Sequence, residues 1–327
     1  MKILLALDHS ECSQLAVESV LSRKWSEGTA FRLVHVLEPF NPIEANANIS
    51  PEQWSCMVDV ECNRRRIVAE RMLQSAVSRL TSTHPRCEVT TCLSESDMAD
   101  QSIVDIACEW MADLIVLGSH SRRGLNRLLL GSVANSVLLN APCAVEIVKA
   151  QKTAQVCETF NVLLALDDSR FSEAAFLEVL RRPWTENTEF KLVTVIKTAL
   201  DACIGVDNAV SVLGILSDEA QSAKVARAGL AAKAAQLREQ LKPCNIAVDL
   251  MSGDPRDTLL QLIEDWPAHL VVLGSHGRTG LGRLFLGSVS QAIALHARCS
   301  VEIVKLRVSD AAQKDRERGS SVSAKLK

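Results

Sequence analysis

The sequence predicts two tandem α/β domains, each a doubly wound, mainly parallel β-sheet flanked by helices, and three observations support this fold class. The chain has 327 residues, about the length of two domains. Apolar runs of strand length alternate with helical patterns, as in βαβ units. Three blocks of sequence recur in the same order at offsets of 156 to 159 residues. This spacing is far longer than a solenoid repeat, so the chain is an internal duplication of one domain.

The recurring blocks define the two domains. They pair Ile3–Ser10 with Val162–Ser169, Trp25–Val36 with Trp184–Val195, and Asp113–Ala150 with His269–Leu306, where 23 of 38 positions are identical. We therefore expect one domain at residues 1–150 and a second at residues 160–306, joined by a short polar linker. The remaining residues, 307–327, are polar and charged, and we expect a disordered tail.

Each element of the first repeat has its own local signal. Ile3–Leu7 is a continuous apolar run, typical of a strand buried on both faces, and Ser10 suits the N-cap of the helix that follows. The pattern predicts strands at 3–7, 31–37, 87–92, 114–117 and 143–148, and helices at 10–22, 53–80, 97–109 and 132–139. The second repeat follows the same order, with an alanine-rich long helix at 218–241.

The composition excludes several classes of protein. A net charge of −3 and a pI near 6.2 give no basic surface for a nucleic-acid backbone. No apolar stretch reaches the ~18–20 residues of a membrane span, and the apolar run at the N-terminus is too short for a signal peptide. The eleven cysteines contain no C-x-x-C pair, which favours free, mostly buried thiols in a reducing compartment. We expect a cytoplasmic protein that contacts neither nucleic acid nor membrane.

Two features stand at the carboxyl ends of predicted strands, where open α/β sheets bind ligands. One is the aspartate that closes the first strand of each repeat, Asp8 and Asp167. The other is the segment Gly274–Ser288, GSHGRTGLGRLFLGS, between the fourth strand and the last helix. Its glycines allow close backbone approach to an anion, and the helix that starts near Ser288, which could cap it, adds free N–H groups. Arg278 and Arg283 could supply positive charge. The residues alone leave open that these glycines only form turns and that the arginines are solvated.

The spacing G-x2-G-x9-G-S, formed by Gly274, Gly277, Gly287 and Ser288, resembles the nucleotide loop of the universal stress protein family. The resemblance covers both repeats, roughly residues 1–150 and 160–306. It implies a five-stranded parallel sheet in the order 3-2-1-4-5. It also implies ATP, with or without Mg²⁺, as a ligand bound between strands 1 and 4.

The resemblance also assigns residues. In the second repeat, Asp167 and Val195 would contact adenine and Gly274 would lie near the ribose. The phosphates would be held by Gly277, Gly287 and Ser288, and the charge of Arg278 makes it a further candidate for this site. In the first repeat, the matching positions are Asp8, Val36, Gly118, Gly131 and Ser132, but Ser121 replaces the second glycine. If that position requires φ > 0, the serine weakens binding, so we expect binding mainly in the second domain.

We expect an adenine-nucleotide-binding, stress-response regulatory protein with an unknown protein partner and no efficient catalysis, because the loop offers no obvious general base. A contact module that binds no nucleotide and a slow ATPase are the alternatives. His120 and His276 are each isolated, so no metal site is expected. The family's usual pairing of last strands further implies an intramolecular pseudo-dimer through Val145–Lys149 and Val301–Lys305. The register we expect sets Glu146 against Lys305 and Glu302 against Lys149.

Overall fold

The computed structural model describes residues 1–40, 50–120, 130–150, 159–196, 209–241, 244–277 and 286–306, with the side chains of 51 and 209–219 left out. The chain forms two compact units that divide between Ala141 and Pro142, and each is described by itself.

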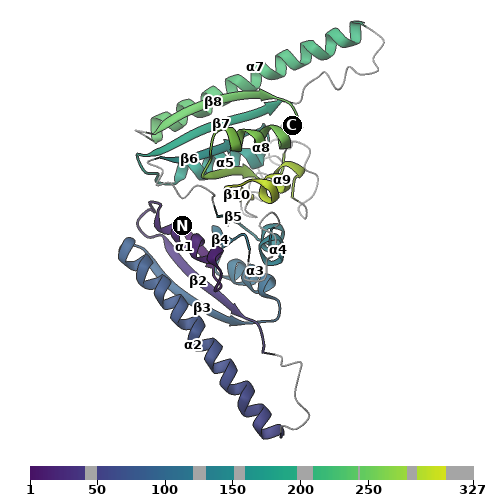
Figure 1. Cartoon of the computed structure of the whole chain (residues 1–327). Helices are drawn as coiled ribbons and strands as arrows, with labels where there is room; N and C mark the ends of the chain where they lie inside the picture. Colours follow the sequence, from purple (N-terminus) through teal and green to yellow (C-terminus); the bar gives the residue numbers. More distant parts are fainter. Residues whose placement is uncertain are drawn as a thin grey trace, which may run out of the picture. The chain divides into compact units, whose positions relative to one another are not determined.

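The first unit is a parallel four-stranded sheet covered by helices on both faces (Figure 1). Its elements are β1 (Lys2–Ala6), α1 (Glu11–Leu21), β2 (Ala30–Leu37), α2 (Pro51–Thr83), β3 (Glu88–Glu95), α3 (Ala99–Glu109), β4 (Leu114–Gly118) and α4 (Ser132–Asn140). The strand order is β3-β2-β1-β4. Helix α1 packs with α2, and α3 packs with α4. The crossovers of a doubly wound fold are thus present, as predicted.

The second unit contains the complete predicted sheet. Its elements are β5 (Ala144–Val148), β6 (Phe160–Ala165), α5 (Arg170–Arg181), β7 (Thr188–Ile196), α7 (Ala209–Gln240), β8 (Asn245–Ser252), α8 (Pro255–Asp265), β9 (Leu270–Gly274), α9 (Ser288–His296) and β10 (Ser300–Val304). The parallel strands lie in the order β8-β7-β6-β9-β10, which is the predicted 3-2-1-4-5. Helix α7 begins at Ala209, nine residues before the predicted start.

Corresponding local contacts hold the two repeats in the same form. Trp25 Nε1 donates to the Val20 carbonyl at 2.8 Å, and Trp184 Nε1 donates to the Val179 carbonyl at 2.8 Å. Each contact fastens the chain after the first helix of its repeat. The core is aliphatic, as the composition predicts: the largest fully buried side chains are mostly Leu and Ile, with three Phe.

The two VEIVK strands pair antiparallel within the second unit, but the predicted register was wrong. Glu302 lies opposite Glu146, with Val301 opposite Ile147. Both glutamates are fully buried. Arg182 accounts for this unexpected register, since its guanidinium donates to both carboxylate oxygens of Glu302 at 2.5 Å. Burial alone would lower the pKa of Arg182. The charge and hydrogen bonds of Glu302, with a smaller contribution from the charge of Glu146, outweigh burial and raise this pKa above its usual value.

The cysteine expectation held only in part. The nine cysteines among the described residues are free, but only Cys143 and Cys299 are buried, whereas Cys56, Cys62 and Cys108 are exposed. Over the described part of the chain, none of the helices has both the length and the apolar character needed to cross a bilayer.

Candidate functional site

In the first unit, a network of hydrogen bonds shapes the loop that follows β1. The Asp8 N–H donates to Ser13 Oγ at 2.7 Å, and Asp8 Oδ1 accepts from the Ser10 N–H at 3.0 Å and from its hydroxyl at 2.5 Å. Ser10 Oγ also caps α1, and it lies 3.3 Å from the carbonyl oxygen of His120, beyond β4. The loops that leave β1 and β4 are therefore joined at the carboxyl edge of the sheet.

The second unit repeats this network. The Asp167 N–H donates to Ser172 Oγ at 2.9 Å, and Asp167 Oδ1 accepts from the Ser169 N–H at 2.9 Å. Ser169 Oγ caps α5 and donates to the His276 carbonyl at 3.2 Å. Equivalent distances agree within 0.2 Å between the units. The duplicated sequence therefore builds the same frame twice, with one carboxylate oxygen of each aspartate held by the loop.

The glycine that ends the fourth strand is required by packing. A Cβ on Gly118 would lie 2.7 Å from a backbone carbon of Cys12, and a Cβ on Gly274 would lie 2.5 Å from a backbone carbon of Phe171. These contacts lie in the first turns of α1 and α5. The absence of a side chain thus lets each helix start directly against the strand, a role that the sequence reasoning missed.

The last helix of each repeat starts without a side-chain cap. Gly131 and Gly287 are the N-caps of α4 and α9, and neither helix has a side-chain capping hydrogen bond. The expectation that Ser288 could cap the helix is wrong, because Ser288 is the first helical residue. The first-turn N–H groups have no partner within their helix, and the positive end of the helix dipole lies at the same place. Both helix ends can accept an anion.

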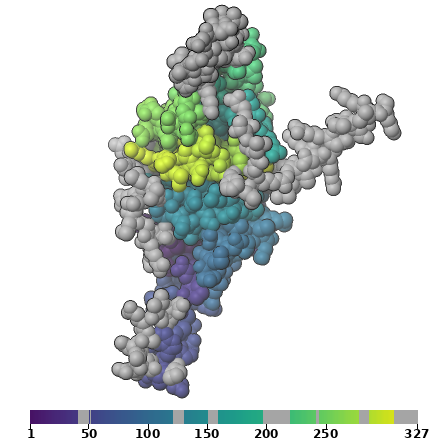
Figure 2. Space-filling model, turned by 90° about the vertical axis from the view of Figure 1, so that its right-hand side faces the viewer, coloured from purple at the N-terminus to yellow at the C-terminus, as the bar shows by residue number. Residues whose placement is uncertain are grey.

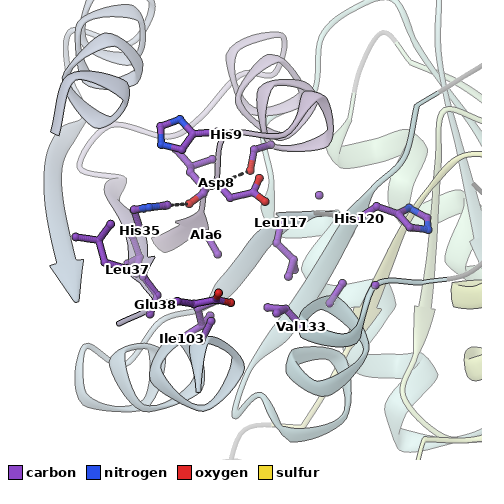
Figure 3. A pocket seen from close by; sticks show the side chains of 18 of the residues that line it. Ala6, Asp8, His9, His35, Leu37, Glu38, Ile103, Leu117, His120 and Val133 are labelled. Atoms are coloured by element: carbon purple, nitrogen blue, oxygen red, sulfur yellow. Dashed lines mark hydrogen bonds between the residues drawn. The ribbon is translucent and has the colours of Figure 1, made fainter. Parts of the chain in front are cut away.

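In the first unit the five predicted site residues lie in one cavity. Asp8, Val36, Gly118, Gly131 and Ser132 line a space of about 470 Å³ at the carboxyl ends of β1, β2 and β4 (Figure 3). This volume lies within the usual range for small-molecule sites. The structure thus brings together residues that are far apart in the sequence.

The cavity also contains two histidines that the sequence reasoning did not single out. His35 Nδ1 lies 2.7 Å from the Leu7 carbonyl, which can only accept, so Nδ1 carries the proton. The rings of His9 and His35 are 5.5 Å apart and meet edge to face. At the equivalent positions, the second repeat has Asp168 and Thr194. The two sites therefore differ chemically near the ends of the first two strands.

Helix α2 supplies charged side chains to the same cavity. Arg64 and Arg65 line it, and both guanidinium groups bond Glu61, Arg64 through two contacts of 2.7 Å and Arg65 through one of 3.0 Å. The hydrogen bond from Arg64, followed by that from Arg65, lowers the pKa of Glu61 to about 2. The side chain of Arg64 is 63% exposed, but its position at the cavity could be found only from the packing of α2.

In the second unit, Gly277 lies against the aspartate of the site. A Cβ at this position would lie 3.0 Å from Asp167 Oδ2. Its φ is not in the left-handed region, so the condition of φ > 0 does not apply here and the constraint is one of space. Val195 is half-buried near the end of β7. Arg278, Arg283 and Ser121 lie outside the described residues.

The paired loop histidines occupy equivalent places. His276 Nδ1 lies 3.1 Å from Ser275 Oγ, and its ring is 4.7 Å from that of Phe171. His120 Nδ1 lies 3.1 Å from Ser119 Oγ. Within the described ranges, His, Cys, Asp and Glu form no group of three or more that could hold a metal ion.

The sequence profile of the Universal stress protein family matches residues 1–149 and, separately, residues 159–305. The chain belongs to the universal stress protein family. A universal stress protein of Mycolicibacterium smegmatis is 28% identical over 305 residues, covering 93% of this chain and 97% of its own. Universal stress protein Rv2005c of Mycobacterium tuberculosis is 32% identical over 205 residues, covering 62% of this chain and 65% of its own.

Solved structures with the same fold include a universal stress protein. This protein, from Archaeoglobus fulgidus, superposes with a TM-score of 0.59 at 18% identity, covering 93% of this chain and 98% of that one. A Pseudomonas aeruginosa protein of unknown function, PA1789, superposes with a TM-score of 0.55 at 14% identity, covering 93% and 92%. At these identities, the likeness supports the tandem fold alone.

Proposed function

We propose that this universal stress protein is a regulatory protein that binds an adenine nucleotide, ATP in the first instance, and does not turn it over efficiently. One observation carries the proposal. In both repeats, an aspartate and the uncapped N-terminus of the last helix stand at the carboxyl ends of adjacent strands. An aspartate can accept hydrogen bonds from a base or a ribose, and a helix N-terminus favours phosphate. Their joint placement fits a nucleotide better than either group does alone.

We propose the following roles. In the second repeat, Asp167 and Val195 would contact adenine and Gly274 would lie near the ribose, with Gly277, Arg278, Gly287 and Ser288 around the phosphates. Asp8, Val36, Gly118, Gly131 and Ser132 are the first-repeat set. Mg²⁺, where present, would neutralise phosphate charge.

We propose that the second domain is the main site. Gly277 leaves room beside Asp167 that a larger residue would reduce, because a Cβ there would stand 3.0 Å from the carboxylate. The first repeat has Ser121 at the equivalent position. Isothermal titration with ATP should give a stoichiometry near one per chain, much reduced in Gly277→Ser and closer to two in Ser121→Gly. Two equal sites in the unmodified protein would contradict this asymmetry.

A matched pair of charge variants tests where the phosphates lie. Ser288→Asp and Ser132→Asp each place a carboxylate in the first turn of a nine-residue helix. An acidic residue there stabilises the helix by ~0.3–1 kcal/mol, so the fold should be retained, but it repels phosphate. We expect Ser288→Asp to weaken ATP binding about tenfold or more, and Ser132→Asp to have a smaller effect on total binding. Equal affinity in all three proteins would overturn the proposed phosphate site.

Two further measurements separate the alternatives. Nucleotide released on heating freshly purified protein supports binding, whereas none released and none bound on titration favours a contact module. Phosphate release that exceeds a Gly287→Val control would indicate a slow ATPase. We expect bound nucleotide and no such excess.

A further inference from the structure

No described side chain in the N-terminal half of α2 is fully buried, although Trp54 and Val58 are half-buried. The buried apolar residues of this 33-residue helix, Ala69, Leu73, Ala76 and Leu80, all lie in its C-terminal half. Figures 1 and 2 show its first turns extending beyond the rest of the first unit. An isolated helical segment of this length is marginally stable in water, so packing against another surface would stabilise it.

The projecting segment carries an apolar stripe directed away from its own core. Met57, Val60 and Ile67 are 54%, 63% and 47% exposed. With Arg64, whose long and mostly exposed side chain also borders the cavity, they follow a 3-4-3 spacing that lines one side of a helix. At 100° per residue, this side is roughly opposite the buried one. Such a stripe is typical of a helix that packs against another helix.

The charges of the segment indicate which helix packs against this stripe. Between residues 51 and 61, α2 has three carboxylates, Glu52, Asp59 and Glu61, and no cation. Between residues 62 and 72 it has four arginines and one glutamate. Glu61 bonds Arg64 and Arg65, and Arg66 bonds Glu95, but these contacts do not change the sign of either end. A second copy of the helix, placed antiparallel, sets the acidic end of each against the basic end of the other.

We propose that α2 is the contact surface for a second copy of this chain, with the two α2 helices antiparallel and centred near residue 62. Met57 of each copy then faces Ile67 of the other, and Val60 faces the aliphatic stem of Arg64. The opposed helix dipoles also attract in this orientation. A contact of a few helical turns is small for a protein interface, so the dimer is weak and reversible.

A matched pair of exposed valines tests the surface. Val60→Lys in full-length protein places a charge at the centre of the stripe, and Val225→Lys does so on α7, where Val225 is 54% exposed. In sedimentation measurements over a range of protein concentrations, Val60→Lys should raise the dimer Kd about tenfold or more and Val225→Lys less than about twofold. Circular dichroism and the melting temperature establish that both variants fold. An unmodified protein that stays monomeric up to about 100 µM, or a dimer that Val60→Lys leaves unchanged, overturns the proposal.

Disulfide trapping tests the orientation. In a background with Cys56→Ser and Cys62→Ser, a mixture of the Val60→Cys and Arg64→Cys proteins should form the mixed disulfide in excess over either self-linked product. Arg64→Cys also removes one arginine from the basic end, so the unoxidised mixture is first shown to dimerise. A predominance of Val60→Cys self-linking would indicate parallel helices and overturn the arrangement. Reversing the sign of Asp59 with Asp59→Arg should weaken the dimer severalfold, and added salt should diminish that difference.

Discussion

The two repeats share one backbone frame but surround it with different side chains. In both units, serine hydroxyls bond the loop after the first strand to the loop after the fourth, with distances that agree within 0.2 Å. His9 and His35 of the first cavity correspond to Asp168 and Thr194 of the second unit. The network that positions the strands and helices has been kept through the duplication, whereas the side chains around the site have changed. A common fold therefore does not imply a common ligand affinity.

The long helices pack alike where their side chains can be compared. Both α2 and α7 pack on the second and third strands of their repeat. Among the described side chains, the buried apolar residues lie in the C-terminal half of each helix: Ala69, Leu73, Ala76 and Leu80 in α2, and Leu230, Ala234 and Leu237 in α7. The N-terminal half of α2 also exposes Met57, Val60 and Ile67, the stripe that we propose for association.

The largest effect should come from the buried charges of the second unit. Arg182→Met removes the guanidinium that bonds Glu302 while Glu146 lies opposite, and it leaves uncompensated charge in the core. We expect a loss of roughly 3–5 kcal/mol in the free energy of unfolding, measured by urea denaturation. The neighbouring Arg181→Met should cost less than about 0.5 kcal/mol, because Arg181 is 67% exposed.

A double variant sharpens this result. Adding Glu302→Gln to Arg182→Met removes one of the two buried carboxylates and should restore part of the lost stability. If the single variant is as stable as the unmodified protein, the arginine does not hold the glutamates as described.

The strand-end glycines should show that the two repeats have equal packing constraints. Gly118→Ala and Gly274→Ala each bring a Cβ within 2.7 Å of backbone atoms, and we expect each to lower the free energy of unfolding by about 1–3 kcal/mol. In Gly229→Ala on α7 the new methyl meets nothing within 4 Å, so this control should stabilise by about 0.5–1 kcal/mol. A loss of stability in only one of these two variants would show that the strand ends of the two repeats are not packed equivalently.

The smallest effect concerns the last lysine of each repeat. Burial lowers the pKa of both Lys149 and Lys305 to about 8. The unfolded lysines keep a pKa near 10.4, so between roughly pH 8 and 10.5 the unfolded chain binds more protons. The free energy of unfolding should therefore rise with pH in this window. Below about pH 8 both states are protonated and this contribution to the pH dependence disappears.

Substitution of each lysine tests whether Lys149 and Lys305 cause this pH dependence of stability. Lys149→Met should reduce the difference between the free energies of unfolding measured by denaturation at about pH 7.5 and at about pH 9.5. It also removes the bonds from Nζ to the carbonyls of Leu295 and Ala297 at the end of α9, so the difference between pH values is the readout. Lys305→Met should act similarly, and the exposed Lys224→Met is the control. An unchanged slope in both buried variants would show that the lysines are not desolvated.

Much of the fold could be predicted because its signals are local. The apolar run Ile3–Leu7, the serine caps Ser10 and Ser169, and the recurrence of three blocks each depend on neighbouring residues or on direct comparison of two segments. The carboxyl ends of parallel strands lie at one edge by topology, so the place of the candidate site followed as well.

The sequence by itself determined the duplicated α/β fold, the strand order that the family resemblance implied, and the edge of the sheet where the candidate residues lie. Only the tertiary structure decided which side chains meet there. Glu146 faces Glu302 because a buried arginine compensates their charge, which no repeat of VEIVK reveals. Arg64 and Arg65 reach the first cavity, and Gly277 adjoins Asp167, because helices and loops distant in sequence pack against the same strand ends. Local patterns specify elements, whereas register and close approach depend on contacts between residues that are far apart in the chain.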